Sequence, residues 1–346
     1  MIFSKILNHW YSNNKRVLPW RQTKNPYNIW LSEIILQQTQ IKQGLPYYES
    51  FLKKFPTVFD LAKAKESHVL KIWQGLGYYS RARNLHATAK YIVNELNGEF
   101  PNDYDGLLKL KGVGDYTASA IASICFNQPT AVVDGNVYRL LSRYFGIKTP
   151  INSSKGIKEF KQLAQELIDY NNPADYNQAI MEFGAVQCKP QNPNCEVCPL
   201  LNSCVAFKKK SIGKLPVKIK AAKVSKKYFN YLVFVSKDNK TVLEKRNGKG
   251  IWQNLYQFPL IETEKVMDFK EFETLLKKHH LLKDIDFELS LFNENTIVHK
   301  LSHQHLYTKF WVLIINNIMA EGIPVNDIYN YPVPILIENF IKDFNF

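Results

Sequence analysis

Four cysteines crowd into 17 residues of this 346-residue chain, and their spacing constrains the fold more than any other feature. Cys188, Cys195, Cys198 and Cys204 form a C-x6-C-x2-C-x5-C pattern among three prolines, with little periodicity. Such a segment has no fold of its own, but four thiolates on one metal centre would supply one. Zinc and a 4Fe–4S cluster both accept four cysteine ligands. Zinc sites usually have two separated cysteine pairs, so one crowded loop favours the cluster.

Several classes of protein are excluded by the rest of the chain. No stretch approaches the roughly 18–20 apolar residues of a membrane span. Residues 1–10 lack the apolar region of a secretion signal, so we expect a cytoplasmic protein without a disulfide framework. A length of 346 residues exceeds what one hydrophobic core usually organises, which predicts two domains.

Most of the net charge of +14 lies in the first two-thirds of the chain. Residues 1–200 contain 23 basic and 16 acidic side chains, and residues 201–230 contain nine lysines and no acid. Residues 231–346 contain 13 basic and 15 acidic side chains. This distribution suggests a polyanionic partner for the front of the chain. A solvated, self-repelling linker explains nine lysines equally well, so charge alone leaves both readings open.

The spacing of apolar residues predicts a helical domain over residues 1–207. Turns rich in proline and glycine, such as 44–46 and 98–101, would separate its helices. The expected helices are 28–43, 47–55, 58–63, 67–74, 80–97, 104–110, 115–126, 134–145, 155–170 and 175–187.

The pattern changes after Lys227, where strands become the expectation. We predict a strand at 228–235, a turn at 237–240 and a strand at 241–246 that returns alongside the first one. Further strands are expected at 297–307 and 310–315, and a helix at 268–282. The predicted fold is therefore multidomain, α and α+β. A helical domain is followed by a lysine-rich linker at 208–227 and a small α+β domain at 228–346.

A glycine pair precedes the predicted helix 115–126. Gly112 and Gly114 would let backbone N–H groups approach a phosphate at the N-terminus of that helix. Such a contact positions DNA without reading its sequence. Alone, the pair fits a plain turn between helices. In a basic helical domain followed by four clustered cysteines, the segment 104–126 is typical of the helix-hairpin-helix of DNA repair glycosylases.

Residues 1–210 resemble the endonuclease III superfamily, and the whole chain resembles adenine DNA glycosylases of the MutY type. The resemblance rests on LPWR at 18–21, WLSEIILQQTQ at 30–40, GLGYYSRARN at 75–84, the hairpin, VDGNV at 133–137 and the four cysteines. It implies removal of adenine opposite 8-oxoguanine or guanine in double-stranded DNA. It also implies a 4Fe–4S cluster on Cys188, Cys195, Cys198 and Cys204, in a monomer associated with the nucleoid.

Two carboxyl groups fit this chemistry. Breaking a purine N-glycosidic bond needs a proton for the base and a negative charge beside the sugar, as in glycoside hydrolysis. Glu33 lies in an apolar sequence that would raise its pKa, and the resemblance makes it the acid for adenine N7. Asp134 would stabilise the sugar carbon or bond to it transiently, and Asn136 would orient Asp134. Alone, these carboxyls would read as a surface glutamate and an ordinary helix N-cap.

Tyr116 discriminates between neighbouring activities. Bifunctional relatives have a lysine at this position, whose amine attacks the sugar and cuts the strand. Here Lys111 lies before the glycines instead, so the resemblance implies base removal without strand cleavage. Tyr116 would support Asp134 or the substrate phosphate. The alternatives are a bifunctional pyrimidine glycosylase/lyase and a non-catalytic iron–sulfur DNA-binding protein. Tyr116 disfavours the first, and the pairing of Glu33 with Asp134 disfavours the second.

Further DNA contacts follow from the resemblance alone. Gln38 and Tyr78 match residues that wedge into the base stack, at the usual unstacking cost of a few kcal/mol. Arg21 matches a position near the adenine pocket. Without the resemblance, these three residues would read as a helix-surface glutamine, a core tyrosine and a structural corner.

The back domain resembles the MutT/Nudix-like module of this family, but the hydrolase box is absent. We therefore expect it to recognise the lesion rather than to hydrolyse a pyrophosphate. Ser302 and His303 match residues that contact 8-oxoguanine, while Leu301 replaces a family phenylalanine and puts stacking there in doubt. His299, His303 and His305 would share one strand face. Ordinary surface histidines explain them better than a metal site does.

Overall fold

The computed structural model describes residues 2–220, 224–278, 282, 286–316 and 322–346, and its contacts divide the chain into two units. The first unit comprises Met1–Lys63 and Asn84–Lys220, and the second comprises Ala64–Arg83 and Ala221–Phe346. The sequence pattern predicts that 64–83 belongs to the helical domain, whereas the contacts group it with the second unit. Residues 221–223, which are part of the predicted linker, lie outside the described residues. No helix among the described residues is long and apolar enough to cross a membrane.

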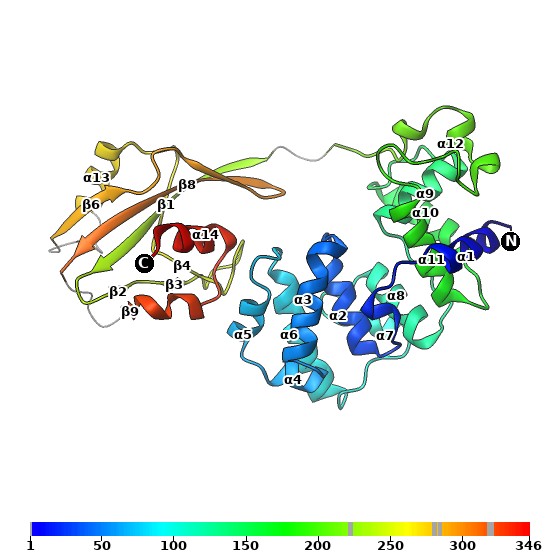
Figure 1. Ribbon diagram of the computed structural model, residues 1–346, viewed down its shortest axis with the longest axis horizontal. Helices are drawn as coiled ribbons and strands as arrows, with labels where there is room; N and C mark the ends of the chain where they lie inside the picture. Colours follow the sequence, from blue (N-terminus) through cyan, green and yellow to red (C-terminus); the bar gives the residue numbers. More distant parts are fainter. Residues whose placement is uncertain (1, 221–223, 279–281, 283–285, 317–321) are drawn as a thin grey trace. The chain divides into compact units, whose positions relative to one another are not determined.

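Short helices joined by tight turns build the first unit (Figure 1). Side chains cap several of them at the N-terminus, including Asn25, Asp103, Asp134 and Ser153, and the resulting hydrogen bonds fix where those helices begin. The helices of residues 1–220 are α1 (Ile2–Asn14), α2 (Pro26–Leu36), α3 (Ile41–Lys54), α4 (Val58–Lys63), α5 (Glu66–Ile72), α6 (Ser80–Glu95), α7 (Tyr104–Leu108), α8 (Asp115–Phe126), α9 (Gly135–Phe145), α10 (Ser154–Leu167), α11 (Pro173–Val186) and α12 (Val205–Lys208). The single-turn helix η1 (Pro19–Arg21) lies between α1 and α2.

The prediction of one helix over 28–43 is wrong. Helix α2 ends at Leu36, and a turn at 37–40 separates it from α3. Gln38 in this turn has a φ of 55°, a left-handed conformation that a continuous α-helix excludes. The expected turn at 44–46 is wrong as well, because Gly44 and Pro46 lie inside α3. Pro46 interrupts the backbone hydrogen bonding of that helix without ending it.

A mixed sheet forms the centre of the second unit. Its strands are β1 (Ser225–Ser236), β5 (Leu260–Thr263), β6 (Phe287–Leu291), β7 (Ile297–Lys300) and β8 (Gln304–Ile315). The order is β5-β1-β8-β6, with β7 also paired to β8. Strands β1 and β8 run parallel along their full length, from Ser225 opposite Gln304 to Ser236 opposite Ile315. Figure 1 shows helices α13 (Phe269–Lys277) and α14 (Ile335–Phe344) packed beside this sheet.

The two faces of the sheet have separate apolar contacts. On one face, Phe272 of α13 stacks on Trp311, with ring centroids 4.2 Å apart, within a buried cluster that includes Leu232. On the other face, Phe340 of α14 stacks on Phe310 at 4.1 Å. Residues 310 and 311 are neighbours and therefore point to opposite faces of the strand. Each helix consequently covers its own side of the sheet.

Two strand predictions in this unit are wrong. Residues 241–246 do not return along β1; they contribute β2 (Lys240–Thr241), paired with β9 (Ile323–Pro324), and β3 (Glu244–Lys245), paired with β4 (Tyr256–Gln257). The expected strand 297–307 is interrupted at 301–303, so β7 and β8 form a hairpin. Part of the predicted helix 268–282, residues 279–281, lies outside the described residues.

Contacts within the second unit explain why it includes 64–83. Lys71 Nζ lies 3.1 Å from the carbonyl oxygen of Tyr331, and the amide of Val333 donates to Gln74 Oε1 at 3.1 Å. Farther along, Arg83 Nη1 donates to the carbonyl of Gln253 at 2.9 Å. These hydrogen bonds join α5, the following loop and the start of α6 to segments more than 160 residues away in the sequence.

Candidate active site

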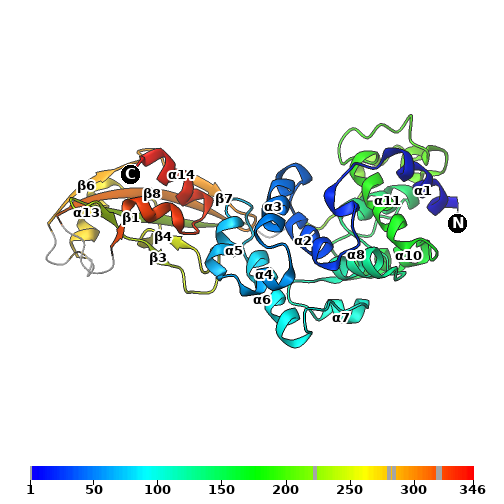
Figure 2. The same cartoon turned by 60° about the horizontal axis from the view of Figure 1, so that its bottom comes forward.

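A cavity of about 560 Å³ in the first unit brings the two predicted catalytic carboxyls together. Its walls come from η1, α2, the turn after α2, the start of α8, the start of α9 and α11. Figure 2 shows α2 beside α8 in this unit. The lining includes Arg16, Trp20, Arg21, Glu33, Gln40, Tyr116, Asp134, Asn136, Met181 and Glu182.

Glu33 is a buried acid in the middle of α2, with 8% of its surface exposed. Burial raises the pKa of its carboxyl to about 7, and the Asp134 carboxylate adds to this effect. A hydrogen bond from Tyr116 and the charge of Arg21 act in the opposite direction but do not cancel it. Near neutral pH the group can therefore hold a proton and release it, as a general acid must.

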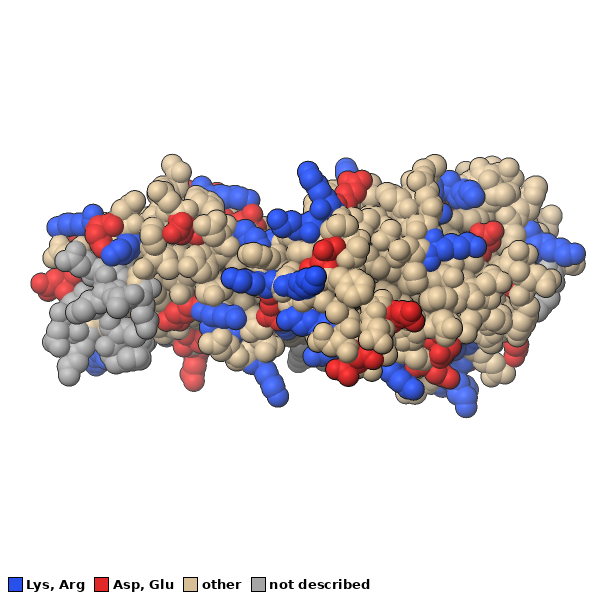
Figure 3. Space-filling model, turned by 90° about the horizontal axis from the view of Figure 1, so that it is seen from below, with Lys and Arg blue, Asp and Glu red and all other residues tan. Residues whose placement is uncertain are grey.

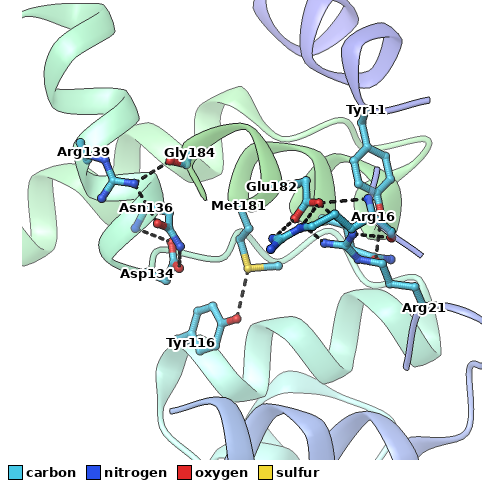
Figure 4. A network of polar contacts seen from close by, with 11 residues as sticks. Tyr11, Arg16, Arg21, Tyr116, Asp134, Asn136, Arg139, Met181, Glu182 and Gly184 are labelled. Carbon is cyan, nitrogen blue, oxygen red and sulfur yellow. Dashed lines mark hydrogen bonds and ion pairs between the residues drawn. The ribbon is translucent and has the colours of Figure 1, made fainter. Parts of the chain in front are cut away.

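Tyr116 lies beside Glu33 at the start of α8. Its hydroxyl is 3.1 Å from the Met181 sulfur (Figure 4). Burial, followed by the neighbouring Glu33 and Asp134 carboxyls, raises the pKa of Tyr116 well above its usual value. The phenol therefore stays protonated and serves as a hydrogen-bond donor near the two carboxyls.

Asp134 caps helix α9 and also faces the cavity. Its Oδ1 accepts the amides of Asn136 and Val137 at 2.9 and 2.8 Å, which is ordinary N-cap geometry. Its Oδ2 accepts Asn136 Nδ2 at 2.7 Å (Figure 4). Burial raises the pKa of Asp134, whereas these hydrogen bonds lower it by favouring the anion. Asp134 can therefore be both the N-cap of α9 and a catalytic carboxylate, because the capping hydrogen bonds hold it at the cavity wall.

Arg139 extends this network toward the cysteines. Its Nη2 donates to Asn136 Oδ1 at 2.9 Å and to the carbonyl of Gly184 at 2.6 Å, and its Nε donates to the carbonyl of Cys188 at 2.8 Å. The side chain is 8% exposed, so water does not readily replace these contacts. Sequence reasoning missed Arg139, although an arginine within the buried half of α9 was a usable signal.

Glu182 is a second residue that sequence reasoning missed. Its side chain is 1% exposed and accepts two hydrogen bonds from Arg16, at 2.7 and 2.6 Å, and two from Arg21, at 3.2 and 2.8 Å. Although burial opposes ionisation, these guanidinium contacts lower the pKa of Glu182 to about 2. Arg21 thus lines the same cavity as Glu33 and Asp134. The sequence signal for Glu182 was a lone carboxyl between Met181 and Phe183 in an apolar helix.

The four clustered cysteines line a single apolar cavity beside α9 and α11. All four thiols are free and partly buried. Arg143 fixes the start of the loop: its Nη1 lies 3.5 Å from the Cys188 sulfur and 2.7 Å from the carbonyl of Lys189. The carbonyls of Pro190 and Leu215 accept from the same guanidinium at 2.9 and 3.1 Å. Helix α9 therefore supports the loop through both Arg139 and Arg143.

Electrostatics and geometry limit what this loop can hold. Burial, together with the charges of Cys188, Cys195 and Cys204, raises the pKa of Cys198 to about 11. Four thiolates in this cavity therefore need positive charge between them. Among the described residues, no three His, Cys, Asp or Glu side chains are grouped to hold a single metal ion. The four sulfurs nevertheless line one apolar cavity, and four cysteines are a ligand set that both zinc and a 4Fe–4S cluster accept.

The glycine hairpin lies between α7 and α8. Gly112 has a φ of +82°, and a Cβ there would lie 2.8 Å from the Asn84 side chain, so glycine is required. Nothing lies within 4 Å of a Cβ placed on Gly114. Gly114 is the N-cap of α8 and supplies no side-chain hydrogen bond, which leaves the first amides of the helix open to a phosphate.

The remaining predicted DNA contacts lie at two places. Gln38 is exposed on the turn after α2, whose neighbours Thr39 and Gln40 line the active-site cavity. Tyr78 belongs to the second unit, is 48% exposed and has a φ of 48°. It lines a cavity of about 440 Å³ together with Trp252, Leu301, Ser302 and His303.

The three histidines do not share one strand. His299 lies in β7, His303 in the turn and His305 in β8, so the expectation of a common strand face is wrong. The Trp252 ring lies 5.8 Å from His299, and burial lowers the pKa of that imidazole. Ser302 Oγ and His303 Nδ1 are 3.3 Å apart, and both residues are exposed at the tip of the hairpin. Ser302 and His303 are thus placed together on an accessible edge.

Comparison with known families agrees with this architecture. The model of the HhH-GPD superfamily base excision DNA repair protein matches residues 31–169, and that of the NUDIX domain matches residues 230–343. The predicted combination of a helical domain and a small α+β domain is therefore confirmed. The first match includes Glu33, the hairpin and Asp134.

Several curated proteins named adenine DNA glycosylase are similar over long stretches. One from Buchnera aphidicola subsp. Schizaphis graminum is 36% identical over 300 residues, which cover 86% of each chain. The human protein of that name is 45% identical over 213 residues, which cover 59% of this chain and 39% of the human one.

Solved structures match the helical part of the chain. A thermostable thymine-DNA glycosylase superposes with a TM-score of 0.56 at 31% identity, covering 60% of this chain and 96% of that one. An endonuclease III–DNA complex gives a TM-score of 0.52 at 24% identity, with the same coverage. The second likeness supports the fold.

Proposed function

This chain belongs to the adenine DNA glycosylase family, and we propose that it removes adenine paired with 8-oxoguanine or guanine in duplex DNA. The observation that carries the proposal is the placement of Glu33 and Asp134 in one cavity, where burial raises the pKa of Glu33 to about 7. A proton donor and a carboxylate are the two groups that N-glycosidic cleavage requires.

In the proposed reaction, the bond between C1′ and N9 breaks and its electron pair leaves with adenine. Glu33 gives its proton to adenine N7, which makes the base a better leaving group. Asp134 offsets the positive charge on the sugar, and Asn136 orients that carboxylate. Water then adds to C1′ and its released proton returns to Glu33.

Tyr116 supports a monofunctional enzyme. Strand cleavage by a glycosylase uses an amine that forms a Schiff base with the sugar. The side chain at the start of α8 is a phenol that keeps its proton, so it cannot act as that amine. We propose that it instead donates a hydrogen bond toward Glu33.

The cysteine loop fits a 4Fe–4S cluster. We propose that Cys188, Cys195, Cys198 and Cys204 bind one iron each, which would neutralise four thiolates that burial and mutual repulsion otherwise disfavour. Bound there, the cluster would order a segment that has short turns and little regular structure. Its chemistry in this proposal is structural.

DNA would be held by the first unit and the lesion read by the second. Gly112 and Gly114 would bind a backbone phosphate, and Gln38 and Tyr78 would enter the base stack. Ser302 and His303 would contact 8-oxoguanine from the cavity next to Tyr78. On the face drawn in Figure 3, lysine and arginine side chains are interspersed with acidic ones. Phosphate contacts on that face would therefore be distributed rather than gathered in one continuous basic patch.

The test is single-turnover excision on duplexes of one sequence that carry A:8-oxoG, A:G, T:G or thymine glycol. We expect adenine release from the first two, and strand breaks only after alkali. Release of thymine or its glycol, or breaks before alkali, would contradict the proposal and support the bifunctional alternative. Binding without release of any base would support a non-catalytic protein.

A further inference from the structure

The hairpin helix begins with an acidic residue, which is unfavourable for a phosphate-binding site. Asp115 directly follows Gly114 and is the first residue of α8, and both residues are exposed. Its side chain is 49% exposed. A free carboxylate there would repel a phosphate and would compete with it for the positive end of the helix dipole.

Two side chains from other elements hold this carboxylate. Lys161 of α10 places its Nζ 3.1 Å from Asp115 Oδ1, and the Tyr104 hydroxyl of α7 donates to the same oxygen. Burial and the Asp115 charge raise the pKa of Tyr104 to about 12, so it remains a donor at neutral pH. The Lys161 ammonium also lies over the Tyr104 ring, 5.5 Å from its centroid.

Lys161 is itself anchored, which distinguishes it from a mobile surface lysine. Its Nζ donates to the carbonyl of Ala131 at 2.8 Å and to Ser119 Oγ at 3.0 Å. With Asp115 these partners use all three N–H groups of the ammonium. The Lys161 ammonium therefore has a fixed position beside the hairpin. It could reach a DNA phosphate only by giving up these hydrogen bonds.

We propose that Lys161, assisted by Tyr104, is a positioning residue that neutralises Asp115 and holds its carboxylate off the amides of α8, so that the hairpin can bind a DNA phosphate. This inference rests on the proposed function, because it assumes that the hairpin contacts DNA. Lys161 acts through Asp115 and does not bind DNA itself. The chain thereby tolerates an aspartate at the first position of its phosphate-binding helix.

The test compares Lys161→Met, Asp115→Asn and the double variant in binding undamaged duplex DNA at two salt concentrations. At low salt, Lys161→Met should weaken binding about fivefold, as expected for one uncompensated charge near a phosphate, and less at high salt. Asp115→Asn should change affinity by no more than about twofold in the native background but should restore the loss in the Lys161→Met background. Tyr104→Phe should show a smaller loss that Asp115→Asn also restores.

Lys158 provides a matched control, because it is an exposed lysine one turn earlier on α10. Any loss in Lys158→Met should not be restored by Asp115→Asn. A Lys161→Met defect that persists in the double variant would overturn the proposal and indicate direct DNA contact or altered folding, which thermal unfolding separates. The proposal would also be overturned if Asp115→Asn changed DNA affinity equally in the native, Lys161→Met and Lys158→Met proteins, because the charges of Asp115 and Lys161 would then act independently.

The proposed function fails in a different way. Adenine excision by the native protein at saturating concentration tests the activity independently of the variants. A native protein that releases no adenine would defeat the proposed function while leaving the affinity comparison interpretable.

Discussion

Arg139 Nε lies 2.8 Å from the carbonyl oxygen of Cys188, so the helix capped by Asp134 also holds the first cysteine of the loop. The same guanidinium binds Asn136, which binds Asp134. Three hydrogen bonds thus form a continuous path from the active-site carboxylate to the cysteine loop. The position of the Asp134 carboxylate and that of the Cys188 main chain are therefore linked through Asn136 and Arg139.

Removing Arg139 should therefore damage both ends. Arg139→Met leaves the carbonyls of Gly184 and Cys188 without this donor, and buried unpaired acceptors cost about 1–3 kcal/mol each. We expect the free energy of unfolding to fall by about 3 kcal/mol, with slower excision and lower iron content. Asn136→Ala is the matched control, because it keeps the contact between Arg139 and Cys188 and should slow excision alone. Native excision by Arg139→Met would show that the path is not needed.

Glu33→Gln should bind duplex DNA but release adenine about 10²–10⁴-fold more slowly, since it keeps the side-chain shape and loses the proton. The native rate should also fall as pH rises through about 7, the pKa of Glu33, because only the protonated acid can donate. Single-turnover excision across a pH series measures both effects. An unchanged rate in the variant would remove Glu33 from the mechanism.

The same substitution should stabilise the protein at alkaline pH. The pKa of Glu33 is 4.5 in the unfolded chain and about 7 in the folded protein. Because the unfolded chain ionises first, the free energy of unfolding falls as pH rises between these two values. Glu33→Gln removes this penalty, and its advantage in free energy of unfolding should grow by about 2 kcal/mol from pH 5 to pH 8. Urea unfolding of both proteins at the two pH values provides the comparison. An advantage independent of pH would contradict the raised pKa.

Protein isolated without oxygen should contain about four irons per chain and be yellow-brown. Cys198→Ser should lower iron content and the melting temperature together, since the loop has no alternative core. Cys125 lies outside the loop, so the Cys125→Ala protein is the control and should keep the native iron content. Stoichiometric zinc without iron in the native protein would refute the cluster.

Ser302→Ala should reduce discrimination rather than activity. One lost hydrogen bond to a base edge is worth about 1–3 kcal/mol, so the preference for A:8-oxoG over A:G should fall roughly 10-fold. His305→Ala, on the neighbouring strand, is the control and should keep the preference. If Ser302→Ala discriminates as the native protein does, the hairpin tip is not the lesion reader.

Local sequence signals predicted the parts of this fold that depend on local interactions. Helix α8 begins and ends where its pattern predicts, because Gly114 and the left-handed Asn127 bound it. The turn at 37–40 was not predicted, since Gln38 at a φ of 55° has no glycine or proline to reveal it. Thr241 was assigned to the wrong partner for a different reason. Strand pairing is set by distant segments, here β9, and not by the nearest turn.

The active site shows the same limit. Glu33 and Asp134 stand in recognisable strings, and their setting among apolar residues was visible in the sequence. Glu182 was not found, because its role depends on Arg16 and Arg21 arriving from 161 or more residues away. Arg139 was missed because two of its partners are the main-chain carbonyls of Gly184 and Cys188, which lie more than 40 residues away and which residue identity does not reveal.

The assignment of 64–83 to the second unit has a practical consequence. The chain passes between the units at 63/64, 83/84 and 220/221, so the second unit is not one contiguous segment. A protein cut near 227 would leave α5 without Tyr331 and Val333, and its defects would mix lost recognition with lost folding. Transplanting this unit into another glycosylase would likewise require moving two segments together. Recombination that exchanges only residues 221–346 would pair them with a foreign segment in place of 64–83.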